Sequence, residues 1–293
     1  MLLIESLSKY CGLINSTNHQ KSKCIMSRIS ECFNNLREHG SKALIPFITA
    51  GDPSPDSTLP LLHALVKGGA NIIEVGVPFS DPMADGPVIQ RSSERALKFS
   101  VSLNDVLEMV ARFRTVDKHT PVILMGYLNP VEVMGYEIFA KRASKAGVDG
   151  VLLVDMPPEE SDELQMYLKL HDIDQIFLLA PTTSDERLDL ICSKGSGFLY
   201  YVSLKGVTGS NRLNIQDVAD RIDHIRSKTD MPVGVGFGIK DPETARSVAG
   251  FSDAIIIGSA LVERIAHSGQ PPDKLADDIS GYIGEIRTAI DAI

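Results

Sequence analysis

Eight short apolar segments, each followed by a longer segment with helical periodicity, constrain the fold of this chain more than any other feature. This alternation is typical of βα units around a parallel sheet, and eight units close a (β/α)8 barrel. The expected strands are 43–49, 71–76, 121–125, 150–154, 175–179, 197–202, 232–237 and 253–258. The expected helices between them are 56–67, 87–98, 103–115, 131–145, 158–171, 184–193, 215–228 and 242–249.

An open doubly wound α/β sheet would show the same alternation, but the sequence favours it less. No G-x-G-x-x-G motif opens a helix after the first expected strand, and no acidic residue stands where a ribose would be held. We therefore expect one barrel domain over 26–293, with an added helix at 28–39 below the barrel and a closing helix at 273–290. Residues 1–25 are expected to be a poorly ordered extension or to precede a native start at Met26, which N-terminal sequencing would test.

Composition excludes several classes of protein. The net charge is −9, with 43% hydrophobic and 23% charged residues, and no stretch combines basic residues with aromatics as a nucleic-acid groove does. No apolar run reaches the roughly 18 residues that a membrane span needs. Four scattered cysteines without C-x-x-C spacing argue against a zinc site and a disulfide framework, which indicates reduced thiols in the cytoplasm. They are Cys11, Cys24, Cys32 and Cys192.

The segment 72–90 carries two carboxylates in unlike surroundings, where we expect the chemistry. Glu74 lies within an apolar strand, so desolvation should raise its pKa and let it hold and donate a proton near neutral pH. Asp85 lies in a turn-rich loop beside Gly86, is expected to be exposed, and should stay ionised. Two acids in unlike environments can take unlike roles. The alternative is that Glu74 is an interior residue satisfied by a neighbour, while Asp85 caps the helix at 87–98.

Active sites of barrels are built at the carboxyl ends of the strands. None of the expected strand ends carries a histidine, so a metal-dependent or imidazole-driven mechanism has little support and acid–base work falls to the carboxylates and a tyrosine. A glycine-bounded loop at 203–212 is expected to act as a lid. Its Lys205 is a poor candidate for a Schiff base, because a solvated lysine keeps its charge. The candidate strand-end residues are Phe47, Thr49, Glu74, Met125, Tyr127, Asp155 and Tyr200.

The last two expected strands end in glycine. Phe237 and Gly238 follow the seventh, and Gly258 precedes Ser259, which is placed to open a helix. Barrels frequently bind phosphate here through backbone N–H groups and a helix N-terminus, so a phosphorylated substrate is expected. The alternative is that these glycines only permit tight strand exits.

Five motifs stand at these strand ends, and together they carry a family resemblance: P-F-I-T-A-G-D-P, E-V-G-V-P-F-S-D-P-M-A-D-G-P-V-I-Q, G-V-T-G, G-F-G-I and I-I-I-G-S-A. From about Ser27 to the C-terminus, the chain resembles the tryptophan synthase alpha subunit family. The resemblance implies retro-aldol cleavage of indole-3-glycerol phosphate to indole and glyceraldehyde 3-phosphate, a step of tryptophan biosynthesis. It also implies that this chain needs no metal or organic cofactor.

The resemblance assigns roles residue by residue. Glu74 matches the acid–base residue, Asp85 the carboxylate that accepts from the indole N–H, and Tyr200 an auxiliary tyrosine. Thr208 matches a lid threonine that reaches the aspartate on closure. Phe198 departs from the pattern, since many relatives have a second tyrosine there. The indole pocket maps to Phe47, Ile89, Met125, Tyr127 and Leu152, and phosphate binding maps to Gly209, Phe237, Gly238, Gly258 and Ser259.

The resemblance further implies a partner, a pyridoxal-phosphate beta subunit in an α2β2 complex. The matching contact loops carry Asp81, Pro82, Asn129 and Pro130. Two other functions fit the motifs: a stand-alone lyase that releases free indole, and a non-catalytic activator of the beta subunit. A sugar-phosphate epimerase fits less well because the expected metal ligands are missing.

Overall fold

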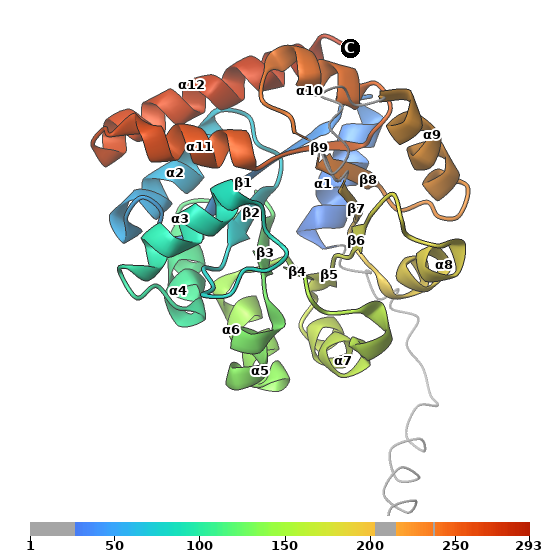
Figure 1. Cartoon of the computed structure of the whole chain (residues 1–293), viewed down its shortest axis with the longest axis horizontal. Helices are drawn as coiled ribbons and strands as arrows, with labels where there is room; N and C mark the ends of the chain where they lie inside the picture. Colours follow the sequence, from blue (N-terminus) through green and yellow to red (C-terminus); the bar gives the residue numbers. More distant parts are fainter. Residues whose placement is uncertain (1–26, 203–214, 237) are drawn as a thin grey trace, which may run out of the picture.

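The computed structural model describes residues 27–202, 215–236 and 238–293, which form a single parallel sheet surrounded by helices (Figure 1). The order of the strands is β5-β4-β3-β2-β1-β9-β8-β7-β6. The strands are β1 Ala43–Thr49, β2 Ile73–Gly76, β3 Val122–Gly126, β4 Gly150–Leu153, β5 Asp174–Gln175, β6 Leu178–Leu179, β7 Leu199–Val202, β8 Val233–Gly236 and β9 Ala254–Ile257.

The helices lie on the outside of the sheet, with α12 along α2 and α10, except α1, which covers the bottom of the barrel. Of the helices in the described part of the chain, none combines the length and apolar character that a bilayer crossing requires. They are α1 Arg28–Glu38, α2 Pro55–Lys67, α3 Pro87–Leu97, α4 Leu103–Phe113, α5 Leu128–Met134, α6 Tyr136–Ala146, η1 Pro158–Glu160, α7 Asp162–Leu170, α8 Asp185–Lys194, α9 Ile215–Arg226, α10 Pro242–Ala249, α11 Ser259–Ser268 and α12 Pro272–Asp291.

The expected fifth strand, 175–179, is present as two short strands that close the barrel. β5 pairs with β4 and β6 pairs with β7, because strands of a tilted, staggered barrel meet each neighbour with a different half. Between them, the N–H of Ile176 donates to Val151 O at 2.9 Å, and the N–H of Tyr200 donates to Phe177 O at 3.1 Å. The (β/α)8 prediction is thus confirmed, while the single unbroken fifth strand was wrong.

Alternation along the strands directs Glu74 into the barrel. On β2, Ile73 and Val75 belong to the apolar layer between the sheet and the helices, whereas Ile72 belongs to the cluster inside the barrel. Successive side chains on a strand point to opposite faces, so Glu74 shares the inner face with Ile72. Its register partner on β1 is Phe47. A carboxylate therefore enters the interior of an otherwise apolar barrel.

Helix α1 covers the bottom of the barrel, as the sequence predicts. The hydroxyl of Ser27 caps it by accepting from Ser30 N at 3.2 Å. Ile29 and Phe33 are buried in the interior cluster, and the Phe33 ring lies 5.6 Å from that of Phe198. Phe198 therefore has a packing role on this side of the interior, which accounts for its apolar character.

Two expected helices are each broken into two. The segment 131–145 contains α5 and α6, separated by Gly135, whose φ of +83° is accessible mainly to glycine. Asn129 and Pro130 consequently lie within α5 and not in a loop, so the expectation of a contact loop there was wrong. In the segment 158–171, the 3-10 turn η1 precedes α7.

Candidate active site

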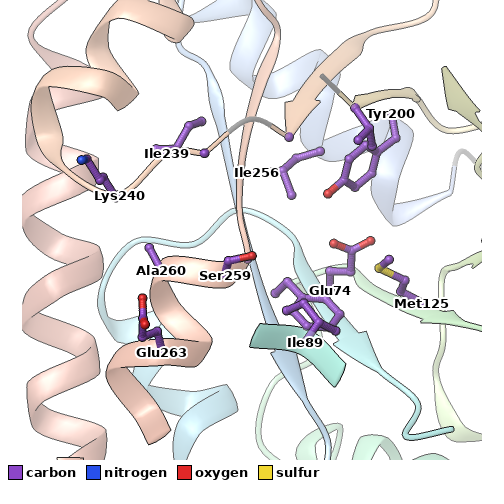
Figure 2. A pocket seen from close by; sticks show the side chains of 15 residues that line it. Glu74, Ile89, Met125, Tyr200, Ile239, Lys240, Ile256, Ser259, Ala260 and Glu263 are labelled. Carbon is purple, nitrogen blue, oxygen red and sulfur yellow. The ribbon is translucent and has the colours of Figure 1, made fainter. Parts of the chain in front are cut away.

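A cavity of about 340 Å³ opens at the carboxyl ends of the strands (Figure 2). Glu74, Met125 and Tyr200 converge on it from β2, β3 and β7, and Ser259 enters from the other side. Strand-end residues that are far apart in the sequence thus meet in this cavity. The predicted site residues that line the cavity are Phe47, Glu74, Ile89, Met125, Tyr200, Gly238, Gly258 and Ser259.

Glu74 is a buried acid at the wall of this cavity. Only 1% of the residue is exposed, and neither carboxylate oxygen has a hydrogen-bond partner among the described residues. Burial raises the pKa of its carboxyl to about 8, with a smaller contribution from the negative charge of Asp85. Glu74 is thus mostly protonated at neutral pH and can donate or accept a proton there. The alternative of an interior glutamate satisfied by a neighbour finds no support in this geometry.

Asp85 lies in a small adjoining cleft that shares Phe47, Ile89 and Met125 with the cavity. It is half-buried, so the expectation of an exposed carboxylate was wrong. Burial raises the pKa of Asp85, and a hydrogen bond from Tyr127 acts in the opposite direction. Asp85 does not cap α3, whose N-cap is Gly86 without a side-chain hydrogen bond.

Tyr127 contacts Asp85 and does not line the cavity. Its hydroxyl donates to Asp85 Oδ2 at 3.0 Å and accepts from Ala84 N at 3.0 Å. Its ring stacks on that of Phe79 with centroids 5.0 Å apart. The family resemblance places Tyr127 in the indole pocket. Tyr127 lines the adjoining cleft with Phe47, Ile89 and Met125, and the direction of its hydroxyl could not be read from its strand-end position.

Tyr200 faces Glu74 across the cavity, and burial, followed by the charges of Glu74 and Asp85, raises the pKa of its hydroxyl. Its ring lies against Gly236, where an added Cβ would come within 2.5 Å of Tyr200 Cε1. A similar Cβ at Gly76 would come within 2.5 Å of Phe47 Cζ. Both glycines therefore make room for aromatic rings of the cavity, which the sequence alone does not show.

The side of the cavity away from Glu74 is built by the exits of β8 and β9. Gly238 adopts a φ of +46°, and Gly258 is the N-cap of α11. The first N–H groups of a helix have no partner within the helix, so the start of α11 presents donors and partial positive charge to the cavity. This arrangement suits an anion such as phosphate.

Sequence reasoning missed two charged residues of this cavity, Lys240 and Glu263. Lys240 comes four residues after the end of β8, and Glu263 comes four residues after Ser259 on α11. Two signals in the sequence could have identified them. Lys240 stands just past the end of a strand, and Glu263 stands about one helical turn after the candidate phosphate ligand Ser259.

Other expected residues are placed elsewhere. Leu152 is fully buried in the interior cluster and does not line the cavity. Thr49 shares a 2.6 Å hydrogen bond with Ser92, and Asp155 accepts from Leu128 N at the start of α5, so both have structural partners. Four further residues named in the sequence analysis lie outside the described part of the chain: Lys205, Thr208, Gly209 and Phe237.

The two expected partner-contact segments lie side by side. The bond from Ala84 N to the Tyr127 hydroxyl joins the loop after β2 to the residue before α5. Asp81 and Asn129 are exposed, and Pro82 and Pro130 are half-buried. Exposed apolar side chains accompany both segments, with Met83 at 86% and Val133 at 82% exposure.

A closed (β/α)8 barrel whose cavity at the strand ends holds a largely protonated glutamate, beside a second acid and a tyrosine, defines an acid–base enzyme of the barrel class. Comparison with known proteins identifies the family. The profile of the tryptophan synthase alpha chain family matches residues 33–291, and the chain belongs to this family.

Individual relatives agree with this assignment. The tryptophan synthase alpha chain of Thioalkalivibrio sulfidiphilus is 57% identical over 266 residues, covering 91% of this chain and 100% of the relative. That of Methylococcus capsulatus is 56% identical over 267 residues, with 91% and 100% covered. A crystal structure of tryptophan synthase subunit alpha from Legionella pneumophila superposes with a TM-score of 0.85 at 45% identity, covering 92% of this chain and 100% of that one.

Proposed function

We propose that this chain is a carbon–carbon lyase of tryptophan biosynthesis, which cleaves indole-3-glycerol phosphate into indole and glyceraldehyde 3-phosphate. The observation that carries the proposal is the buried, unpartnered carboxyl of Glu74 at the wall of the cavity, with a pKa near neutrality. A group of this kind can both give and take a proton during one turnover. The cleavage involves no net oxidation or reduction, so this chain needs no metal, redox partner or cofactor of its own.

The cleavage needs two proton movements, and Glu74 is placed to serve both. Its protonated carboxyl delivers a proton to C3 of the indole, while Asp85 accepts the ring N–H, which gives the indolenine tautomer. The glutamate, now charged, removes the proton of the glycerol hydroxyl next to the ring. The electrons of the carbon–carbon bond return to the ring, the nitrogen regains its proton from Asp85, and the hydroxyl carbon becomes the aldehyde.

The other residues bind and orient the substrate. Phe47, Ile89 and Met125 supply an apolar slot for the indole. Gly238, Gly258 and Ser259 bind the phosphate through the donors at the start of α11, with Gly209 and Phe237 completing this part of the site. The Tyr200 hydroxyl assists at the reacting centre. Thr208 couples closure of a lid to Asp85.

The partner is a beta subunit that carries pyridoxal phosphate and consumes the indole in an α2β2 complex. We place its contact on the adjoining segments that carry Asp81, Pro82, Asn129 and Pro130. The exposed apolar side chains of Met83 and Val133 support this placement, because such patches mark protein interfaces. We place the complex in the cytoplasm, in keeping with the scattered cysteines of the sequence and with the free thiols of Cys32 and Cys192.

The test is release of indole from indole-3-glycerol phosphate by the purified chain, with and without a beta subunit, beside a Glu74→Gln control. Slow release that rises with the partner and falls about 10²- to 10⁴-fold in the variant is expected. Fast release without the partner would favour a stand-alone lyase. No release under either condition, with activation of the beta subunit intact, would leave a non-catalytic activator.

A further inference from the structure

Two side chains of opposite charge, Lys240 and Glu263, line the cavity on the side away from Glu74. Figure 2 shows Ser259 and Ala260 between them and Glu74 across the cavity. Neither charged side chain makes a hydrogen bond or ion pair with any residue in 27–202, 215–236 or 238–293, although the charge of Lys240 acts on the neighbouring carboxylate of Asp241. Both are therefore available to a ligand.

The main chain at Lys240 is held in place by its neighbours. Ile239 is 3% exposed, and the hydroxyl of Tyr282 on α12 donates to Lys240 O at 3.0 Å. The next residue, Asp241, caps α10 by accepting from Thr244 N at 2.8 Å. A fixed main chain thus holds the exposed Lys240 at the rim of the cavity, and in Figure 2 its ammonium group lies on the side away from Ser259. Among the described residues that line the cavity, Lys240 is the basic one.

Glu263 approaches the same space from α11. It lies four residues after Ser259, so the two side chains share one face of the helix that begins at the cavity. Its carboxylate is exposed and opposes the positive potential of the helix start. A phosphate bound beside Ser259 would therefore be attracted by Lys240 and repelled by Glu263.

We propose that Lys240 and Glu263 are specificity-determining residues that set, in opposite directions, how tightly the cavity holds the phosphate of its ligand. Lys240 attracts the phosphate from the rim of the cavity and strengthens binding. Glu263 weakens it, which allows the phosphorylated product to leave. This inference rests on the proposed function, because it takes the substrate to be a phosphate ester bound beside Ser259.

The test is calorimetric binding of glycerol 3-phosphate and of inorganic phosphate to the full chain, followed by kinetics with indole-3-glycerol phosphate. Lys240→Met should weaken binding and raise KM about three- to tenfold, with kcat unchanged, and Lys240→Arg should restore most of the affinity. Glu263→Gln should tighten binding about two- to threefold. Lys274→Met makes the same charge change on an exposed position of α12 outside the cavity lining and should change neither value.

Unchanged phosphate binding in Lys240→Met, or weaker binding in Glu263→Gln, would overturn the inference. A shift of kcat without KM would also overturn it, because the pair would then act on chemistry and not on holding the phosphate. Failure of the proposed function gives a different result. Suppose that the wild-type chain binds glycerol 3-phosphate, that Lys240→Met weakens this binding, and that no indole is released. The roles of Lys240 and Glu263 in phosphate binding would then stand, while the proposed lyase function would be refuted.

Discussion

The hydroxyl of Tyr127 donates a 3.0 Å hydrogen bond to the carboxylate of Asp85 and thereby fixes one of the two acids of the site. The same oxygen accepts from Ala84 N, so the loop that carries Asp85 is attached to the residue after β3. Tyr127 is therefore a positioning residue for Asp85. Its effect on catalysis should pass through the orientation and pKa of that carboxylate.

Replacing Tyr127 by Phe should lower kcat/KM and move its acidic limb to higher pH. The hydrogen bond stabilises the charged form of Asp85 and holds its pKa down, so its loss raises the pKa. One buried hydrogen bond is worth about 1 kcal/mol of unfolding free energy, so the fold should survive. A pH–rate profile checks this expectation. Tyr167→Phe on α7 is the control, and equal profiles for wild type and Tyr127→Phe would contradict the positioning role.

Glu74 should make the protein less stable as pH rises. Its pKa of about 8 in the folded state lies above the ordinary value of 4.5, so the folded state binds the proton more tightly than the unfolded chain does. Its stabilising effect is fully present below pH 4.5 and is lost between 4.5 and 8. Glu74→Gln does not titrate in this range. Its free energy of unfolding should therefore rise by about 2–5 kcal/mol relative to that of the wild type as the pH increases across that window. Denaturant unfolding at pH 5 and pH 8 measures it, and a constant difference would refute it.

Adding a methyl group at Gly236 should disturb the site more than the fold. The new Cβ would meet the Tyr200 ring at 2.5 Å and force it out of its position in the cavity, at a cost of about 1–3 kcal/mol. Indole release by Gly236→Ala should fall at least tenfold, a factor that corresponds to about 1.4 kcal/mol. The control is Gly284→Ala, on α12 with no atom near its added Cβ, which should stabilise by about 0.5–1 kcal/mol. Full activity in Gly236→Ala would show that Tyr200 can move freely.

Gly135 should resist substitution although nothing lies near it. With φ +83° and ψ 134°, it adopts a conformation that other residues reach only with strain, so Gly135→Ala should cost about 1–3 kcal/mol. Gly86, with φ −73° and equally open surroundings, is the matched control and should tolerate alanine. Thermal unfolding of the two variants compares them directly. Similar melting temperatures would mean that the α5–α6 junction can rearrange.

The barrel could be predicted because its apolar strands and amphipathic helices are local patterns in the sequence, and these patterns recur as strands and helices in the structure. The division of the expected strand 175–179 into β5 and β6 was missed because the exchange of partners between β4 and β7 depends on the stagger of the closed sheet. Glu74 was identifiable because a carboxylate within an apolar strand is conspicuous. The bond from Tyr127 to Asp85, and the convergence of Lys240 and Glu263, join distant segments, and no local pattern records where two such side chains meet.

Among the described residues, the packing of Phe33 against Phe198 fills the barrel interior at the α1 end, opposite the cavity. Substrate, indole and the phosphorylated product must all pass through the mouth formed by the carboxyl ends of the strands. The products must therefore leave through the opening by which the substrate enters, before the next substrate can bind. Any route that carries indole onward to a partner has to begin on that face. A partner bound elsewhere on the molecule could influence the enzyme but could not receive its product directly.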